Sequence, residues 1–204
     1  MSFVIRKIEE NDYEEVEVMT REAFWNIYRP GCSEHLVVNK IHNSKKSIEE
    51  LELVGEYNHK IAGHIVYTKG HVVGVEDETF ISFGPLSVLP ELQGKGIGSV
   101  LVRISLQKAA REGYSAVFIT GDENYYSRFG FEPASKYNIH MDGVPVEDEA
   151  PFFMVKVLKE GYLDNVNGSF VFDYCYDVSE EEVDEFDKAF EFKEKEVREG
   201  QLKF

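Results

Sequence analysis

The sequence of 204 residues has no long apolar run, and none approaches the roughly 18 residues that a membrane-spanning helix requires. Residues 1–7 include no apolar core of the kind found in secretory signal peptides. Cysteine is scarce, since Cys32 and Cys175 lie far apart and match no metal-binding spacing. These absences predict a soluble, cytoplasmic protein with two free thiols, no bound metal and no membrane association.

Basic residues are also few, with 22 Lys and Arg against 38 Asp and Glu, which gives a formal net charge of −16. Such a chain repels phosphate backbones, so nucleic acid is an improbable partner. The acidity is uneven, because residues 161–204 carry 13 acidic and 5 basic side chains. Two interpretations stay open, namely a solvated surface that aids solubility and a surface that attracts a cationic substrate.

The most informative stretch is Phe83–Ser99, which reads FGPLSVLPELQGKGIGS. An apolar strand pattern ends at Leu89, and Pro90 interrupts it because proline has no N–H for a strand ladder. A glycine-rich turn follows and leads directly into a helical pattern. The first N–H groups of a helix lack intrahelical partners, and glycine lets the backbone approach a phosphate closely. The stretch therefore predicts a pyrophosphate cradle.

The spacing of the glycines distinguishes among phosphate-binding motifs. Neither G-x-G-x-x-G nor the Walker pattern G-x-x-x-x-G-K-[ST] fits any window of this stretch. The pattern Q-x-x-G-x-G does fit, shortly after L-x-V, and a segment YYSRFGFEP follows at Tyr125–Pro133. Together these motifs resemble the acetyl-CoA signature and the Y-x-x-x-G-F segment of the GNAT superfamily of N-acetyltransferases, in its YhbS-like branch. The resemblance covers roughly residues 3–158.

The resemblance implies that acetyl-CoA is the acyl donor and that two groups of residues hold it. The pyrophosphate is expected on the cradle residues Gln93, Gly94, Lys95, Gly96, Ile97, Gly98 and Ser99. The pantetheine arm is expected to pair like an extra strand with the backbone of Leu86, Ser87 and Val88. The resemblance also implies an α/β (α+β) fold with a mixed, mostly antiparallel sheet. The central strand of this sheet contains Pro85, which by itself predicts a bulge or an edge. The resemblance implies that the strand splays from its neighbour at this point and that helices cover both faces of the sheet.

The periodicity of the chain predicts the remaining elements. Helices are expected near 12–24, 33–43, 96–112 and 123–129, and strands at 3–8, 51–57, 60–69, 79–89, 116–120 and 151–158. Residues 70–78 are expected to form a loop or a frayed hairpin. We divide the chain into an acetyltransferase domain, 1–158, and an acidic extension, 159–204. The extension is predicted to contain a strand at 169–176 and an amphipathic helix that begins at a capping box, Ser179-x-x-Glu182, and continues toward Val197. Such a helix can dock at a homodimer interface.

Transfer of an acetyl group from a thioester to an amine requires positioning, polarisation of the carbonyl and protonation of the leaving thiolate. By the resemblance, Tyr126 is the candidate general acid, although a role restricted to packing or to a hydrogen bond with the sulfur stays open. The resemblance also implies that Phe24, Trp25 and Tyr28, with Glu22, are candidates for the acceptor pocket, although Phe24 and Trp25 can instead be core residues. Glu22 is a weaker candidate for the general base, with a chain of water molecules as the alternative.

The sequence therefore predicts an N-acetyltransferase that acetylates a primary amine of a small molecule or peptide. The alternative is a catalytically weak acyl-CoA-binding regulatory or interaction protein that keeps the cleft without turnover.

Overall fold

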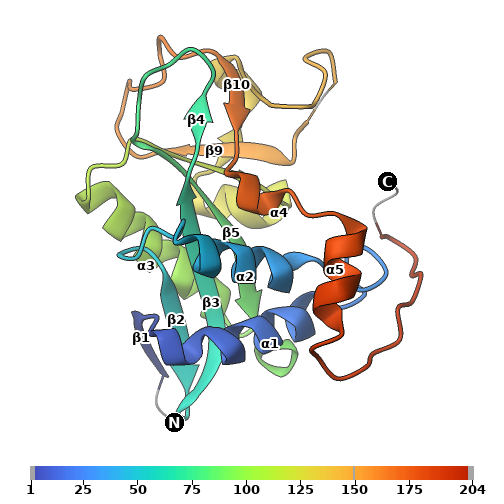
Figure 1. Cartoon of the computed structure of the whole chain (residues 1–204). Coiled ribbons are helices and arrows are strands. Elements are labelled where there is room, and N and C mark those ends of the chain that lie inside the picture. Colours follow the sequence, from blue (N-terminus) through green and yellow to red (C-terminus); the bar gives the residue numbers. More distant parts are fainter. Residues whose placement is uncertain (1–2, 149, 202–204) are drawn as a thin grey trace. The chain divides into compact units, whose positions relative to one another are not determined.

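A computed structural model describes residues 3–148 and 150–201 (Figure 1). The chain divides into two compact units, and strands and a helix pass from one unit into the other. The first unit comprises Met1–Val66, Pro85–Leu101 and Tyr174–Phe204, and the second comprises Tyr67–Gly84 and Val102–Asp173. Within the described ranges, every helix is too short or too polar to cross a lipid bilayer.

The strands of the first unit follow the order β1-β2-β3-β5. They are β1 (Phe3–Lys7), β2 (Leu53–Tyr57), the first part of β3 (Lys60–Lys69) and the last part of β5 (Phe80–Val88). β2 and β3 form the expected hairpin, and Asn58 and His59 at its tip have φ angles of 50° and 66°. Two left-handed residues in succession give the backbone twist that suits a two-residue hairpin turn.

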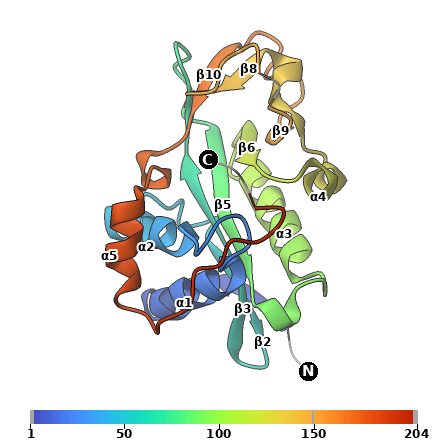
Figure 2. The same cartoon turned by 90° about the vertical axis from the view of Figure 1, so that its right-hand side faces the viewer.

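Helices cover both faces of these strands, as predicted. The helices of this unit are α1 (Tyr13–Phe24), α2 (Glu34–Ser44), the start of α3 (Ile97–Arg111) and α5 (Glu180–Asp187), with 3₁₀ turns at Glu10–Asp12, Pro90–Leu92 and Tyr174–Tyr176. Helices α1 and α2 lie against one face of β2 and β3 (Figure 2), where Val16 and Val38 form a buried cluster with Val54. α3 approaches so closely that a Cβ on Gly63 of β3 would lie 2.8 Å from Ile97 and 3.0 Å from Leu101.

The second unit holds the strand order β3-β5-β6-β9-β7 and a small sheet β4-β10-β8. Its further strands are β4 (His71–Val72), β6 (Ala116–Thr120), β7 (Glu132–Pro133), β8 (Ile139–Met141), β9 (Phe153–Val157) and β10 (Gly168–Val171). Helix α4 (Glu123–Tyr126) is followed by 3₁₀ turns at Ser127–Phe129 and Ala134–Tyr137. The pairings β5–β6 and β8–β10 are parallel, and β1–β2, β2–β3, β6–β9, β7–β9 and β4–β10 are antiparallel. The predicted mixed, mostly antiparallel sheet is confirmed.

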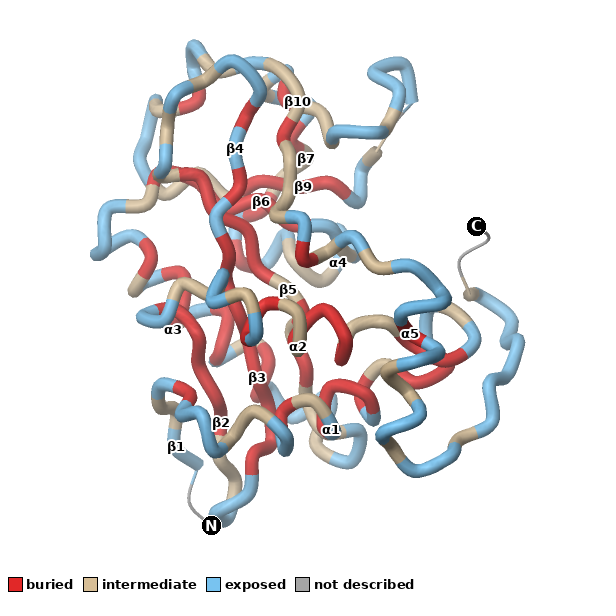
Figure 3. The backbone as a smooth tube through the Cα atoms, viewed as in Figure 1, coloured by how far each residue is buried: buried red, intermediate tan, exposed pale blue. Residues whose placement is uncertain are grey.

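Aromatic rings fill the core of the second unit. Phe118 of β6 stacks on Phe170 of β10 with ring centroids 4.1 Å apart, and both side chains are fully buried. Figure 3 shows most of β6 in the colour of buried residues. Gly70 leaves room for the second of these rings, since a Cβ there would lie 2.2 Å from the Phe170 Cζ atom. Phe170 lies beyond residue 158, so part of the predicted extension packs within the aromatic core.

Three predicted elements differ from those observed. The segment 70–78, expected to be a loop or a frayed hairpin, contains the two-residue strand β4, which pairs with β10 and not within a local hairpin. The strand expected at 169–176 ends at Val171 and gives way to a 3₁₀ turn. The last helix ends at Asp187 instead of continuing toward Val197, which is 88% exposed. Beyond Asp187, backbone carbonyls accept hydrogen bonds from side chains of α1 and the turn after it, and these tertiary contacts outweigh helical periodicity.

Candidate active site

The central strand β5 parts from β6 where the sequence predicts it. The parallel ladder between them ends at the pair Ser82↔Phe118, whereas β6 continues to Thr120 and stays paired with β9. Gly84 follows on β5 with a φ angle of 151°, a conformation that favours glycine, and Pro85 comes next. Pro85 cannot continue the ladder, because proline has no N–H to donate.

The strand continues through Leu86, Ser87 and Val88, which the sequence assigns to the pantetheine arm. Ser87 is fully buried, and its Oγ lies 2.8 Å from the Oγ1 of Thr20 in α1. Leu86 and Val88 are half-buried. The hydrogen bond fixes this part of β5 against helix α1, while alternation along the strand turns its neighbours to the opposite face.

The predicted cradle is formed by the turn Gln93–Gly96 and the first turn of α3. Gly94 and Gly96 have φ angles of 72° and 90°, and a Cβ built on either would have no atom within 4 Å. The first i→i−4 hydrogen bond of α3 joins the Val100 N–H to the Gly96 carbonyl. The preceding N–H groups therefore lie outside the helical ladder, at the positive end of a 15-residue helix.

Several contacts hold the cradle against the end of β5. The Gln93 side-chain amide donates to the Val88 carbonyl at 3.1 Å, and Lys95 Nζ donates to the Glu91 carbonyl at 2.9 Å. The backbone N–H of Leu89 donates to the Ala62 carbonyl on β3 at 3.0 Å. The structure thus brings the predicted cradle and the predicted pantetheine strand together in one unit.

Tyr126, the candidate general acid, belongs to α4 in the second unit. Its half-buried ring packs between Phe83 and Phe131, with centroids 5.8 Å from each. On another side it lies over Gly121, where a Cβ would come within 2.4 Å of the Tyr126 Cε2 atom. Asp122 begins the helix by accepting the N–H of Asn124 at 2.9 Å. The ring is therefore confined on three sides.

The predicted acceptor residues lie in two different settings. The rings of Phe24 and Tyr28 are 6.0 Å apart, and Tyr28 is 49% exposed. Trp25 is buried instead, and its Nε1 donates to the Glu194 carbonyl of the C-terminal segment at 3.0 Å. Glu22 lies on an exposed part of α1, where Lys193 Nζ contacts its Oε2 at 2.6 Å. Two positions along a helix turn the chain by about 200°, so Glu22 faces away from the Thr20 side chain that contacts β5.

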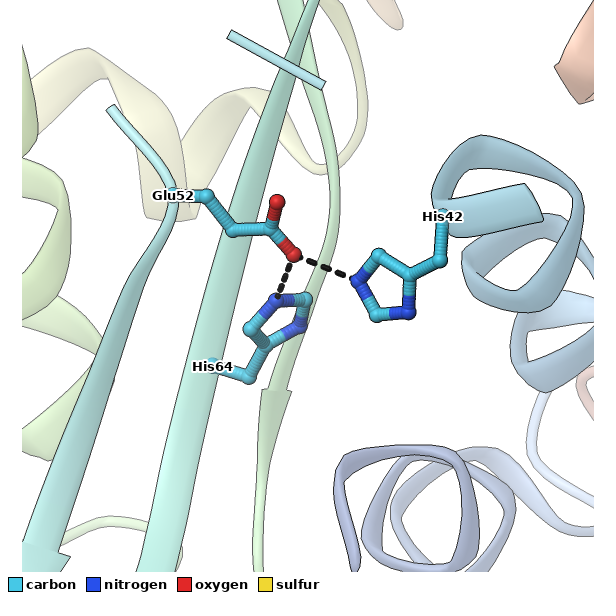
Figure 4. Close-up of side chains that lie close together, drawn as sticks. All are labelled: His42, Glu52 and His64. Carbon is cyan, nitrogen blue, oxygen red and sulfur yellow. Dashed lines mark hydrogen bonds and ion pairs between the residues drawn. The ribbon is translucent and has the colours of Figure 1, made fainter. Parts of the chain in front are cut away.

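Sequence reasoning missed two clusters of buried polar residues in the first unit. His35 lies between the Cys32 Sγ atom, 3.5 Å from its Nδ1, and the Asp187 carboxylate, 2.9 Å from its Nε2. Burial raises the pKa of Cys32, so this thiol is not activated as a nucleophile. The second cluster joins His42, Glu52 and His64 (Figure 4). For this cluster, the sequence signals were Glu52 inside the apolar run LELV and His64 inside AGHIV, and no such signal marked His42.

Comparisons with known proteins agree with this geometry. The family model described as the acetyltransferase (GNAT) family matches residues 17–131. The chain is 34% identical over 100 residues to YjhQ, an uncharacterized N-acetyltransferase of Escherichia coli K12, a match that covers 48% of this chain and 55% of YjhQ. It is 31% identical over 109 residues to YhbS, another uncharacterized N-acetyltransferase of that strain, and this match covers 53% of this chain and 63% of YhbS. The chain thus matches less than two thirds of the length of either relative.

Two solved structures have a similar fold. A GNAT family acetyltransferase from Brucella melitensis in complex with acetyl-CoA aligns with a TM-score of 0.71 and 26% identity, covering 86% of this chain and 99% of that one. Escherichia coli YhbS in complex with CoA aligns with a TM-score of 0.76 and 24% identity, and the alignment covers 85% of this chain and 91% of the YhbS chain. The second likeness, at its lower identity, establishes the fold alone.

Proposed function

Because this chain belongs to the acetyltransferase (GNAT) family, we propose that it transfers the acetyl group of acetyl-CoA directly to a primary amine of a small molecule or peptide. The observation that carries the proposal is the cradle, in which two left-handed glycines open onto free space beside the N-terminus of α3. The whole chain has a formal charge of −16, so an anionic donor must be held by local N–H groups.

The donor's pantetheine arm is assigned to the strand Leu86–Val88, beyond the last β5–β6 pair at Ser82. A strand that leaves its ladder can pair through its backbone with an amide-containing ligand. A backbone N–H of the same segment is assigned to the thioester carbonyl, where negative charge develops during transfer. The contact between Ser87 and Thr20 supports this assignment because it keeps the segment fixed.

In the proposed reaction, the amine nitrogen bonds to the acetyl carbon and the carbon–sulfur bond breaks. The Tyr126 hydroxyl donates its proton to the departing thiolate, and the proton lost by the amine passes to a base or to water. A phenol with a pKa near 10 is protonated at neutral pH and can make this donation. The direct reaction requires no metal ion and no covalent acyl-enzyme.

The choice of acceptor determines whether a dedicated base is needed. A lysine-like amine has a pKa about 3.4 units above neutral, so its deprotonation costs roughly 4.6 kcal/mol. An α-amine with a pKa near 7.8 costs only about 1 kcal/mol. Glu22 stays our candidate base, and in that role its ion pair with Lys193 must open first.

A pair of matched glycine variants tests the cradle. Gly96 and Gly113 have nearly equal φ angles, 90° and 89°, and open space around an added Cβ, so alanine causes similar backbone strain at both. Only Gly96→Ala places a methyl group at the cradle. We expect calorimetry to show CoA binding weakened by about 10-fold or more in Gly96→Ala, the value of a hydrogen bond to a charged group, and unchanged in Gly113→Ala. Equal affinities in the two variants would refute the assignment.

A further inference from the structure

The polar cluster of His42, Glu52 and His64 draws its three side chains from separate elements of the first unit (Figure 4). His42 lies in the last turn of α2, Glu52 precedes β2, and His64 lies within β3. The carboxylate oxygen Oε1 lies 2.6 Å from the His42 Nε2 and 3.1 Å from the His64 Nε2. The two imidazole rings are nearly perpendicular, at 69°, so the donors converge from different directions.

These side chains are withdrawn from solvent, with exposures of 3% for His42, 1% for Glu52 and 0% for His64. Tyr13 stacks on the outer face of His42 with ring centroids 3.7 Å apart. In the described part of the chain, the Nδ1 atoms of both histidines are buried without a hydrogen-bond partner. Among the described residues, each imidazole therefore makes its hydrogen bond only through the Nε2 atom that faces the shared carboxylate.

The shared oxygen of Glu52 lies between the two imidazole rings and is withdrawn from water together with them. A cation held beside a buried carboxylate offsets the cost of removing that group from water.

We propose that His42, Glu52 and His64 form a structural binding site for a divalent transition-metal ion, with Zn²⁺ as the best-fitting class. The donor set of two imidazole nitrogens and one carboxylate oxygen suits Zn²⁺, Co²⁺ or Ni²⁺ and disfavours Mg²⁺ and Ca²⁺, which prefer oxygen. The ion would join α2 to β2 and β3. This site is separate from the proposed acetyl transfer.

The two carboxylate–imidazole distances support the fit. Metal–ligand bonds of about 2.0–2.1 Å in a tetrahedral arrangement separate the ligand atoms by about 3.3 Å. The observed hydrogen-bond separations of 2.6 and 3.1 Å would therefore open by about 0.7 and 0.2 Å, within the reach of side-chain rotation. The metal would take the place of the two Nε2 protons, and each neutral ring would carry its proton on Nδ1 instead.

The unpartnered Nδ1 atoms limit the expected affinity. A metal-bound histidine usually donates its other N–H to an acceptor, and loss of such a partner weakens binding about 10–100-fold. Neither ring has that acceptor among the described residues. We therefore expect a dissociation constant on the order of a micromolar, weaker than a four-ligand structural zinc site.

The test uses chelator-treated full-length protein and Zn²⁺, with Co²⁺ as a spectroscopic probe and Mg²⁺ as a negative control. Because the donors are buried, metal is added both to the folded protein and before refolding. We expect one equivalent of Zn²⁺ to bind and raise the melting temperature, and Co²⁺ to give absorption bands of a low-symmetry site. Glu52→Gln should weaken binding at least 10-fold. The matched control, His35→Gln, changes another buried histidine beside a carboxylate and should bind as the parent does.

Equal binding by Glu52→Gln, or no saturable binding by the parent, would overturn the proposal. If Glu52→Gln fails to fold, NMR of the parent decides instead. Long-range proton–nitrogen spectra should show the His42 and His64 rings moving their protons from Nε2 to Nδ1 when Zn²⁺ is added. Unchanged imidazole signals at saturating Zn²⁺ would place any bound metal on exposed histidines and refute the site.

Discussion

The packing of Tyr126 against Gly121 gives a sharp test of the proposed general acid. Alanine is compatible with the backbone at Gly121, which lies outside the left-handed region. Its Cβ, however, would come within 2.4 Å of the Tyr126 Cε2 atom and 2.9 Å of Cδ2. Carbon atoms in contact prefer about 3.5 Å, so the ring must move by about 1 Å. Phe83 and Phe131 restrict the directions in which it can do so.

The magnitude follows from the cost of misplacing a reacting group. A shift of 1 Å can lower the rate about 100-fold, which corresponds to about 2.7 kcal/mol in the barrier. We expect Gly121→Ala to lower kcat by that order, and Tyr126→Phe to lower it about 100-fold or more while the amine KM and CoA affinity change little. The assay is release of free CoA thiol at saturating amine. Tyr125→Phe, which removes the neighbouring hydroxyl, is the matched control and should retain the parent rate.

A double-mutant cycle separates positioning from general damage. If Gly121→Ala acts by displacing the Tyr126 hydroxyl, adding it to Tyr126→Phe should cost little further activity. Parent-like turnover in Gly121→Ala would refute the positioning argument. Fully multiplicative losses in the double variant would show that the glycine acts independently of the hydroxyl. A fall of only two- or three-fold in Tyr126→Phe would reduce this residue to a packing role.

Two further predictions concern stability. Burial lowers the pKa of His35, and its partner Asp187 is already paired with Arg21, so the folded protein keeps this imidazole neutral. As the pH falls below about 6.5, the unfolding free energy should decrease by up to about 1.4 kcal/mol per pH unit. Denaturation curves at pH 7 and pH 5 should show a smaller decrease for His35→Gln than for the parent. An equal decrease in the two proteins would contradict this prediction. The side chains of Arg21 and Trp25 donate to backbone carbonyls beyond residue 187, and Arg21 also donates to the Asp187 carboxylate. We therefore expect residues 174–201 to resist limited proteolysis in the parent and to be cleaved faster in Asp187→Asn. Early release of a resistant 1–158 fragment would instead support the domain boundary predicted from sequence.

Local signals predicted the central strand and the glycine turn before α3 correctly. Pro90 and the glycines at 94 and 96 determine the conformation of the backbone at their own positions. The turn can therefore be inferred from a short stretch of sequence, without knowledge of distant contacts. Pro85 by itself indicated a bulge or an edge, and the family resemblance implied the splay, which the end of the β5–β6 ladder at Ser82 confirms. Their functional roles, with that of Tyr126, stay predictions.

Long-range partners could not be inferred in this way. The periodicity of the last helix extends past Asp187, but hydrogen bonds from Arg21 and Trp25 take the following carbonyls out of a helical ladder. His42 and Glu52 gave no recognisable spacing, since a helix end, a loop and a strand bring the cluster together only in the folded chain. Such contacts depend on topology, which hydrophobic periodicity does not encode.

The central claim, that this chain is an acetyl-CoA-dependent amine acetyltransferase, is tested most directly by one measurement on the parent protein. Acetyl-CoA is incubated with a panel of polyamines, aminoglycosides, amino acids and peptides with free N-termini, while free CoA thiol is recorded. We predict that at least one class of amine accelerates thiol release and yields a product with the mass of its N-acetyl derivative. Tight binding of acetyl-CoA without acceleration by any amine would contradict the claim and favour an acyl-CoA-binding protein.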